Sequence, residues 1–294
     1  MNTRNIRFKS NRVRDIIGFF HEELDGMYGA GEVGVFCDML FEAFLGWDKV
    51  RLLTSKEQTI DQSDLLRFHW ALEDLRKQRP IQHIIGYTDF CGCRIEVCPD
   101  VLVPRPETEE MVEWIISTFN IQHSSFNILD LCTGSGCIAI ALKRAFPGAA
   151  VAAVDVSAAA LAVARRNAAA NGVEVRFEER DVMAGIDGHY DLIVSNPPYV
   201  RDSERAQMRR NVTDYDPALA LFVPDGDPLR FYRAIATIAA GHLAQDGLLV
   251  VEINEALADE TCAVLRVAGL ATAVHDDFRG KARWISATFN YTTQ

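Results

Sequence analysis

Two patterns of apolar and polar residues divide the chain. Between residues 4 and 78 apolar residues recur at the spacing of a helix. In "DLLRFHWALEDLRKQ" one helical face carries Leu65, Leu66, His69, Leu72 and Leu75. Pro80 follows this stretch, and a proline commonly marks the end of a helical segment. The pattern predicts a small helical amino-terminal domain over residues 1–80.

Short extended pieces replace the helical pattern after Pro80. In "DFCGCRIEVCPDVLVP" the glycine at position 92 suits a turn, and Ile95 and Val97 alternate with polar residues. This predicts a β-hairpin within residues 81–106 that links two domains.

Apolar strands alternate with helical segments from residue 107 onward. We expect strands at 127–131, 149–155, 173–177, 190–195, 247–253 and 284–289. Such strict alternation predicts an α/β domain over residues 107–294, with a mostly parallel sheet covered by helices on both faces. The carboxyl ends of parallel strands share one edge of a sheet, where α/β folds bind their ligands.

Composition narrows the protein class. The chain has 294 residues and 49% hydrophobic content, enough for a large core. The basic amino terminus lacks the apolar stretch of a secretory signal, and no segment is both apolar and long enough to span a membrane, so we expect a cytoplasmic protein. Seven cysteines without framework spacing indicate reduced thiols. A net charge of −11 argues against stable nucleic-acid binding, which normally needs a basic face.

The first chemical signal is "ILDLCTGSGCIAIAL", residues 128–142. An apolar strand runs into a loop with Gly134 and Gly136 and then into a helix, so bare backbone can approach a ligand. The loop lacks the third glycine of the dinucleotide fingerprint and the Lys-Ser/Thr of a Walker loop, which disfavours a diphosphate ligand. The glycines alone could equally serve a tight turn.

Two acids follow at the ends of the next strands. Asp155 lies 19 residues beyond Gly136, where a carboxylate can accept hydrogen bonds from ribose hydroxyls. Asp181 could meet the edge of an adenine. Either acid could instead cap a helix. Their joint occurrence at successive strand ends favours an adenosine compound as ligand.

The stretch "SNPPYV" ends the expected strand at 190–195 with a rigid turn, because proline fixes its own φ and donates no backbone hydrogen bond. The turn holds two hydrogen-bond acceptors, Asn196 Oδ1 and the Pro197 carbonyl, in fixed positions from which they could bind the N–H groups of a substrate. Tyr199 could cover the face of that substrate group. The bland alternative is a turn-forming asparagine and a packing tyrosine.

Four segments together resemble a known family. They are "PIQHIIGYTDFCGCRIEVCPDVLVPRPETEEMVEW", "NILDLCTGSGCIAIAL", "VSNPPYV" and "FRGKARWISATF". In this order they resemble signatures of the class I S-adenosylmethionine-dependent methyltransferases, and within them of the protein-(glutamine-N5) methyltransferases that modify peptide chain release factors. The resemblance covers nearly all of residues 80–290. DNA adenine and RNA methyltransferases share Asn-Pro-Pro-Tyr, whereas "VLVPRPETE" singles out the glutamine branch.

The resemblance implies a function and a Rossmann-like fold. The implied reaction methylates N5 of the glutamine in the Gly-Gly-Gln loop of a release factor, with S-adenosyl-L-methionine as cofactor. The implied catalytic residues are Asn196, Pro197 and Tyr199. The implied cofactor-binding residues are Thr133, Gly134, Ser135, Gly136, Asp155, Asp181, Val182, Asn196 and Thr108. The implied substrate-binding residues are Asn196, Pro197, Pro198, Tyr199, Arg105 and Glu107. We expect the amino-terminal domain to recognise the substrate protein.

Other functions stay open at this point. They are a ribosomal-protein glutamine methyltransferase, a nucleic-acid amino-group methyltransferase of the N6-adenine type, and a cofactor-binding module without catalysis. The intact Asn-Pro-Pro-Tyr disfavours the module, and the acidity disfavours the nucleic-acid enzyme. The "PRPETE" residues could also merely start a helix with proline and acids.

Three further features of the sequence bear on the site. Cys132 stands where the family usually has the first glycine of its loop, and Asn254 replaces another usual glycine. Cys91, Cys93 and Cys98 lack a fourth ligand at zinc-type spacing, so we expect them to be apolar fillers and expect no metal.

Overall fold

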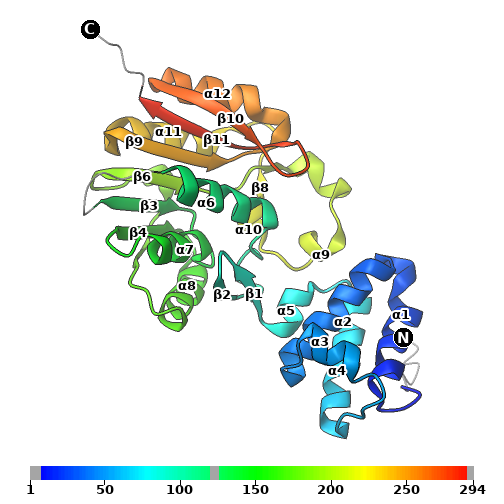
Figure 1. The fold of residues 1–294 in the computed structure, drawn as a ribbon. Helices are drawn as coiled ribbons and strands as arrows, with labels where there is room; N and C mark the ends of the chain where they lie inside the picture. The colour runs from blue at the N-terminus through cyan, green and yellow to red at the C-terminus, as the bar shows by residue number, and fades with distance from the viewer. Residues whose placement is uncertain (1–7, 120–125, 290–294) are drawn as a thin grey trace. The chain divides into compact units, whose positions relative to one another are not determined.

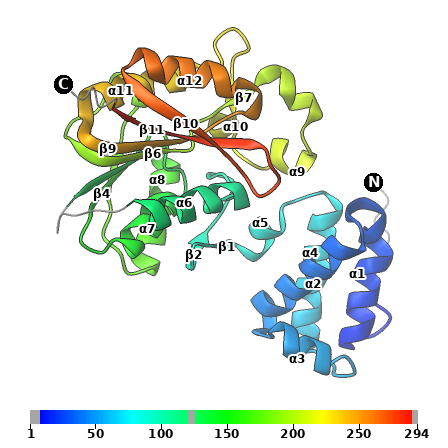
Figure 2. The ribbon, with the colours of Figure 1, turned by 45° about the horizontal axis from the view of Figure 1, so that its top comes forward.

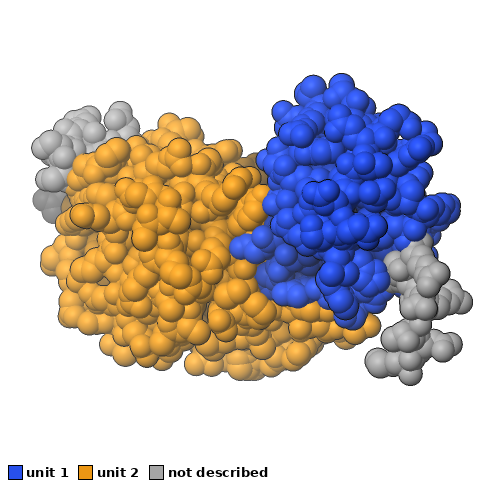
Figure 3. Space-filling model, turned by 90° about the horizontal axis from the view of Figure 1, so that it is seen from below, with its two compact units in different colours: residues 1–86 blue, residues 87–294 orange. Residues whose placement is uncertain are grey.

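A computed structural model describes residues 8–119 and 126–289. The outermost parts of the two expected domains, residues 1–7 and 290–294, and the short segment 120–125 lie outside the described residues. The chain divides into two compact units, residues 1–86 and residues 87–294, which Figure 3 colours blue and orange.

The first unit is helical and has its own core (Figure 2). Its helices are α1 (Val13–Tyr28), α2 (Ala30–Leu45), α3 (Lys49–Thr54), α4 (Gln62–Arg76) and α5 (Ile81–Ile85). Phe20, Phe41 and Phe68 are fully buried and meet ring to ring at the centre of this unit. Aromatic rings bury the most area per residue, so these contacts hold the small helices together.

The buried face of α4 differs from the expected one. It consists of Phe68, Ala71, Leu72 and Leu75, whereas Leu66 is 54% exposed. The large Phe68 ring determines which face turns inward, and Leu66 lies away from it.

The boundary between the units also differs from the expected division at residue 80. Pro80 precedes and caps α5 rather than ending the helical region, because its fixed φ suits the start of a helix. Ile81 then packs into the core of the first unit. The hairpin belongs to the second unit.

The second unit is built on a sheet that has seven strands in the described residues, in the order β10-β11-β9-β6-β3-β4-β5 (Figure 1). The strands are β3 (Asn127–Leu131), β4 (Ala150–Asp155), β5 (Arg176–Glu179), β6 (Tyr190–Ser195), β9 (Leu243–Glu252), β10 (Leu270–Asp276) and β11 (Ala282–Phe289). The five from β5 to β9 run parallel, while β11 is antiparallel to both β9 and β10. The predicted α/β fold with a mostly parallel sheet is confirmed.

Helices cover both faces of this sheet. On one face lie α6 (Pro106–Thr118), α7 (Cys137–Ala145) and α8 (Ala158–Ala170), and on the other lie α11 (Arg230–His242) and α12 (Ala258–Val267). Successive residues of β3 point to opposite cores: Ile128 belongs to the first and Leu129 to the second. Burial on both faces explains why these strands read as continuous apolar runs.

The hairpin consists of β1 (Tyr87–Phe90) and β2 (Cys93–Glu96), which are antiparallel. Its turn residues Cys91 and Gly92 both have positive φ, 47° and 71°, as a two-residue hairpin turn requires. Glu96 pairs with Arg166 of α8 at 2.7 Å, and the backbone N–H of Glu96 donates to Asn167 Oδ1 at 2.7 Å. The hairpin is therefore fastened to the second unit.

Short elements connect the larger ones. They are η1 (Val182–Ala184), β7 (Val200–Arg201), η2 (Asp202–Gln207), α9 (Arg210–Thr213), α10 (Ala218–Leu221), β8 (Phe222–Val223) and η3 (Glu255–Leu257). Over the ranges that the structure describes, no helix combines the length and the apolar character that crossing a membrane requires.

Gly136 and Gly134 make a matched pair for testing how the β3–α7 loop packs. Both have positive φ, 80° and 54°, but a Cβ on Gly136 would lie 3.0 Å from Ala164 Cβ of α8, whereas one on Gly134 would meet nothing within 4 Å. Either alanine incurs backbone strain of about 1–2 kcal/mol. Gly136→Ala should cost a further ~1–3 kcal/mol through the clash with α8.

Urea unfolding of the two variants measures this difference. Equal destabilisation by Gly134→Ala and Gly136→Ala would show that α8 yields freely and that the clash has no energetic cost.

Candidate functional site

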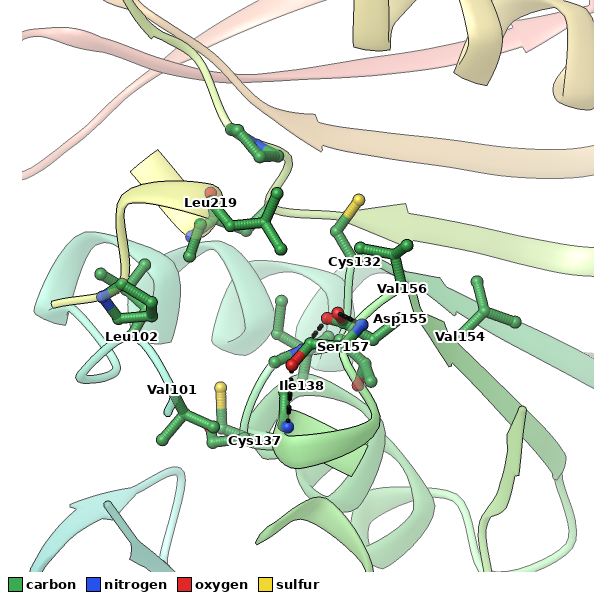
Figure 4. A pocket seen from close by; sticks show the side chains of 18 of the residues that line it. Val101, Leu102, Cys132, Cys137, Ile138, Val154, Asp155, Val156, Ser157 and Leu219 are labelled. Atoms are coloured by element: carbon green, nitrogen blue, oxygen red, sulfur yellow. Dashed lines mark hydrogen bonds between the residues drawn. The ribbon is translucent and has the colours of Figure 1, made fainter. Parts of the chain in front are cut away.

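A pocket opens at the carboxyl edge of the sheet, where the sequence predicts a ligand site. Its walls come from the segment before α6, the loop after β3, the end of β4, the turn after β5, the turn after β6 and the region of α10. Figure 4 shows Cys132, Asp155 and Val156 on one side of it and Leu102 and Leu219 on another. All of these residues belong to the second unit.

The loop after β3 is held by hydrogen bonds to a buried acid within β3, Asp130. Asp130 Oδ2 accepts hydrogen bonds from the Thr133 hydroxyl at 2.5 Å and from the Ala139 N–H at 3.2 Å. Burial raises the pKa of Asp130 to about 7, against the lowering effect of these two donors. Asp130 is not among the residues predicted from the sequence, although an acid inside the apolar run "NILDL" is a usable signal.

Cys132, at the position where the sequence pattern suggests a glycine, adopts a backbone conformation that favours glycine. Its φ is 59°, in the left-handed region, which costs a residue with a side chain about 1–2 kcal/mol. Its side chain lines the pocket (Figure 4), and burial raises the pKa of the thiol, which keeps it neutral. A cysteine at this position thus adopts a strained backbone conformation and adds a sulfur to the pocket wall.

Asp155 ends β4 and is oriented by backbone donors. Its Oδ2 accepts from the Gly134 N–H at 2.8 Å and its Oδ1 from the Ser157 N–H at 2.9 Å. Burial raises its pKa, and the bonds from Ser157, Gly134 and Val156 oppose that shift. A carboxylate has about four lone-pair sites, so beside these three donors Asp155 can still accept from a ligand hydroxyl. The cap of α8 is Ser157, whose hydroxyl accepts from the Ala160 N–H.

Asp181 lines the pocket and also caps a helix. Its side chain accepts from the Met183 N–H at 2.9 Å at the start of η1. Val182 and Arg180 line the pocket beside it. The capping alternative therefore describes Asp181 correctly, and its place in the pocket wall leaves it open to a ligand as well.

The turn after β6 brings Asn196 and Pro198 to the pocket. Pro197, between them in the chain, is buried, and none of the described backbone N–H groups outside helices and strands donates to its carbonyl. Tyr199 packs against the core beneath α11, and its hydroxyl donates to Glu252 Oε1 at 2.8 Å.

A hydrogen-bond chain connects this turn to α6 and β9. Asn196 Nδ2 donates to Thr108 Oγ1 at 3.2 Å, and the Thr108 hydroxyl donates to Glu252 Oε2 at 2.6 Å. Glu252 is 1% exposed, and burial raises its pKa while the two hydroxyl donors and Arg283 lower it. Glu252 is likewise not among the predicted residues, although "GLLVVEI" contains one acid in an apolar run.

Arg105 and Glu107 take different positions at the start of α6. Arg105 lines the pocket and donates to Asp216 Oδ2 at 2.5 Å. The Asp216 side chain is 1% exposed, and burial raises its pKa to about 6 against the attraction of Arg105. Glu107 lies outside the pocket and faces Arg279 at 3.9 Å.

The pocket therefore unites most, but not all, of the predicted site residues. It brings together Arg105, Thr108, Thr133, Gly134, Ser135, Asp155, Asp181, Val182, Asn196 and Pro198. Gly136, Pro197, Tyr199 and Glu107 are not part of its lining. The close approach of α8 already explains why position 136 has no side chain.

Asn254, the second departure from the family pattern, holds the turn after β6 by hydrogen bonds of its side chain. Its Nδ2 donates to the Tyr199 carbonyl at 3.2 Å and to Glu204 at 3.0 Å, and its Oδ1 accepts from the Ala256 N–H. A glycine could make none of these side-chain bonds.

Comparison with known proteins agrees with this geometry. The Methyltransferase small domain family matches residues 111–214, and the PrmC N-terminal domain family matches residues 34–86. A release factor glutamine methyltransferase from Flavobacterium psychrophilum is 41% identical over 276 residues, which cover 92% of this chain and 96% of that protein. One from Bacteroides thetaiotaomicron is 39% identical, with 92% and 98% covered. The chain belongs to the release factor glutamine methyltransferase family.

Membership in the release factor glutamine methyltransferase family confirms the resemblance seen in the sequence, and it makes the chain a methyltransferase enzyme. The hMettl16 catalytic domain, solved in complex with the MAT2A 3′UTR hairpin 6, superposes with a TM-score of 0.52 at 16% identity. The match covers 82% of this chain and 87% of that one. At this identity it shows the fold alone, and it supports the predicted class I methyltransferase fold.

The cysteines of this family member are free thiols. Cys93 is buried in the core under α7, and Cys91 and Cys98 pack against the same core. In the described ranges, His, Cys, Asp and Glu side chains form no group of three or more that could hold a metal ion.

The titration of Asp130 predicts how stability depends on pH. In the unfolded chain an aspartate loses its proton near pH 4, whereas in the folded chain Asp130 keeps it until about pH 7. The folded state binds more protons in this window, so this group makes stability fall as pH rises from about 4 to about 7. Asp130→Asn cannot titrate and still offers an oxygen to Thr133, so it should lack this fall.

Urea unfolding of both proteins across this pH range tests the prediction. Relative to the parent, the free energy of unfolding of the Asn variant should rise by about 1.4 kcal/mol for each pH step of one within the window. Glu174→Gln, at an exposed position, is the control and should show no such trend. A constant difference between the Asp130→Asn protein and its parent would contradict the assignment.

Proposed function

We propose that this chain transfers a methyl group from S-adenosyl-L-methionine to the side-chain amide nitrogen of the glutamine in the Gly-Gly-Gln loop of a peptide chain release factor. The observation that carries the proposal is the position of Asn196. It projects from a proline-stiffened turn into a pocket whose other polar groups suit an adenosine compound. The curated relatives in this family are named for release factors and glutamine.

The donor set of the pocket fits S-adenosyl-L-methionine. Asp155 can still accept from a ribose hydroxyl, and Asp181 and Val182, which line the same pocket, would contact the adenine. Gly134 leaves room for close approach, because nothing occupies the space of its missing side chain. When bound, this cofactor would supply an electrophilic methyl carbon.

The residues of this chain would prepare the amide nitrogen. Asn196 Oδ1 and the Pro197 carbonyl accept hydrogen bonds from its two N–H groups. This localises the nitrogen lone pair as the bond to the methyl carbon forms. Pro197 and Pro198 keep these acceptors fixed, so little reorganisation is needed at the moment of transfer. The methylated nitrogen becomes acidic and releases its proton afterwards, so no strong base is required beside it.

A nucleic-acid substrate is not part of the proposal. The formal charge of −11 lacks the basic excess that phosphate contacts require, and the similarity to an RNA-bound methyltransferase domain extends only to the fold. No observation favours a ribosomal protein over a release factor.

Two substitutions should separate chemistry from cofactor binding. Asn196→Ala should reduce methyl transfer by roughly 100-fold or more, because an acceptor that stabilises developing charge is lost, while cofactor affinity changes only a few-fold. Asp155→Ala should instead weaken S-adenosyl-L-methionine binding by about 1–3 kcal/mol through lost hydrogen bonds to ribose.

Intact-mass analysis of a release factor after incubation with S-adenosyl-L-methionine, followed by peptide mapping, measures the transfer, and calorimetry measures the affinity. A release factor whose loop glutamine is replaced by glutamate is the control and should gain no methyl group. Wild-type turnover in Asn196→Ala would overturn the proposed role of that residue.

We further propose that the helical unit recognises the substrate protein. It has a separate core, and the PrmC N-terminal domain family matches much of it. On α4, Leu66 is 54% exposed and Trp70 is 61% exposed, and residues four apart lie on the same face of a helix. Tryptophan is enriched among the residues that contribute most to protein–protein binding, so Trp70 is the expected centre of this surface and Leu66 its neighbour.

The Leu66→Ser/Trp70→Ala double variant should lower kcat/KM for an intact release factor roughly tenfold, which corresponds to about 1.4 kcal/mol. A short peptide that carries only the Gly-Gly-Gln loop should be methylated at the wild-type rate. Val50→Ser on α3, at a position that is 69% exposed, is the control for a general surface effect. Equal losses for protein and peptide would contradict the recognition role.

A further inference from the structure

Glu252 is an acid at a buried strand position, where an apolar residue would be expected. It ends β9, an interior strand between β6 and β11, and it is almost completely buried. Burying a carboxylate costs several kcal/mol unless hydrogen bonds and charges compensate it. It does not line the pocket. The groups that donate hydrogen bonds to Glu252 therefore indicate which side chains it positions.

Both oxygens of Glu252 accept hydrogen bonds from hydroxyl groups. Oε2 accepts from Thr108 at 2.6 Å and Oε1 from Tyr199 at 2.8 Å. Arg283 attracts the carboxylate from β11 and is itself paired with Asp277 at 3.0 Å, while Glu107 repels it from α6. The two hydroxyl donors and Arg283 favour the ionised carboxylate, while burial and Glu107 oppose it. In the structure both oxygens of Glu252 act as acceptors.

The Thr108 hydroxyl connects Glu252 to Asn196 and determines which end of the Asn196 carboxamide faces it. A threonine hydroxyl has one hydrogen, and Thr108 gives it to Glu252, so toward Asn196 its oxygen can only accept. Asn196 accordingly presents its Nδ2, at 3.2 Å. If the carboxamide turned over, two oxygens would face each other without a hydrogen between them.

We infer that Glu252 is a positioning residue, which through the Thr108 hydroxyl fixes the Asn196 carboxamide with its oxygen available to the substrate amide. The inference rests on the proposed function and deepens it. The substrate amide offers two N–H donors. A reversed Asn196 would present its own NH₂ group to them and could accept no hydrogen bond. Of the described residues, none donates a hydrogen bond to Asn196 Oδ1, which leaves it for the substrate.

The same carboxylate also holds the far end of the turn. Tyr199 is the fourth residue of Asn-Pro-Pro-Tyr, and its hydroxyl is bound to Glu252. The first and last residues of the turn are thus both connected to Glu252 by hydrogen bonds. The two prolines between them have fixed φ angles, so the backbone of the turn is stiff. Orientation of the acceptor and placement of the aromatic ring are coupled.

Three variants test the inference in the full-length protein. Thr108→Val keeps the shape of the side chain and removes its hydroxyl, so kcat should fall on the order of 100-fold. Thr108→Ser keeps the hydroxyl and should restore kcat to within a few-fold of the wild type. Glu252→Gln should lose roughly tenfold, because a carboxamide accepts from only one of the two hydroxyls at a time. Thr108→Val leaves the buried Glu252 with one donor fewer, so its melting temperature should fall, and kcat is compared at a temperature at which every variant is folded. Thr108 also lines the pocket, so the affinity for S-adenosyl-L-methionine is measured for each variant, and any loss of affinity should be smaller than the loss of kcat.

A second measurement does not depend on methyl transfer. In protein labelled with ¹⁵N at asparagine, the Asn196 side-chain NH₂ signal, assigned by its absence in Asn196→Ala, should show slowed hydrogen exchange. The slowing should be lost in Thr108→Val and kept in Thr108→Ser. A wild-type protein that methylates no release factor would refute the proposed function, while this signal would still report on the positioning.

Three outcomes would overturn the inference. The first is wild-type kcat in both Thr108→Val and Glu252→Gln. The second is an equal loss in Thr108→Val and Thr108→Ser. The third is a loss of cofactor affinity that accounts for the whole loss of activity, because it would place Thr108 in cofactor binding alone.

Discussion

Burial of the parallel strands on both faces is the constraint on which the rest of the second unit depends. Because α6, α7 and α8 cover one face and α11 and α12 the other, the strand interiors can hold little except apolar side chains. Polar groups are confined to the strand ends and the turns beyond them. The parallel direction of β3, β4, β5 and β6 brings those ends to one edge, and the pocket follows from that.

The acids at this edge are stabilised mainly by neutral donors. Asp130 and Asp155 receive hydroxyl or backbone N–H groups, and Glu252 receives two hydroxyls. Only Asp216 has a guanidinium in direct contact among these four. Neutral donors orient a carboxyl group without adding a positive charge beside it. Burial therefore outweighs them and raises the pKa of Asp130, Asp155 and Glu252.

Local pattern in the sequence predicted those parts of the structure that local interactions determine. The bounds of β3 and β6 were predicted correctly, because strands buried on both faces give uninterrupted apolar runs. Strand β10 was missed, because it lies at the sheet edge and buries few of its residues. Thr108 was expected near the site, but its partner Glu252 lies 144 residues away, and Arg105 and Asp216 are 111 apart. No periodicity reveals pairs at such separations.

The position of β11 in the sheet has a consequence for synthesis of the chain. This strand lies between β9 and β10, which both precede it in the sequence, and its Trp284 pairs in register with Glu252. On a ribosome, β10 therefore has no strand partner until residues 282–289 have emerged, and the Glu252 end of β9 stays uncovered until then. A nascent chain can therefore pair β3, β4, β5 and β6 while β11 is still unmade, whereas β9 gains its second neighbour only afterwards. The side of the sheet that holds the Glu252 end of β9 is completed after the side that holds β4 and β5.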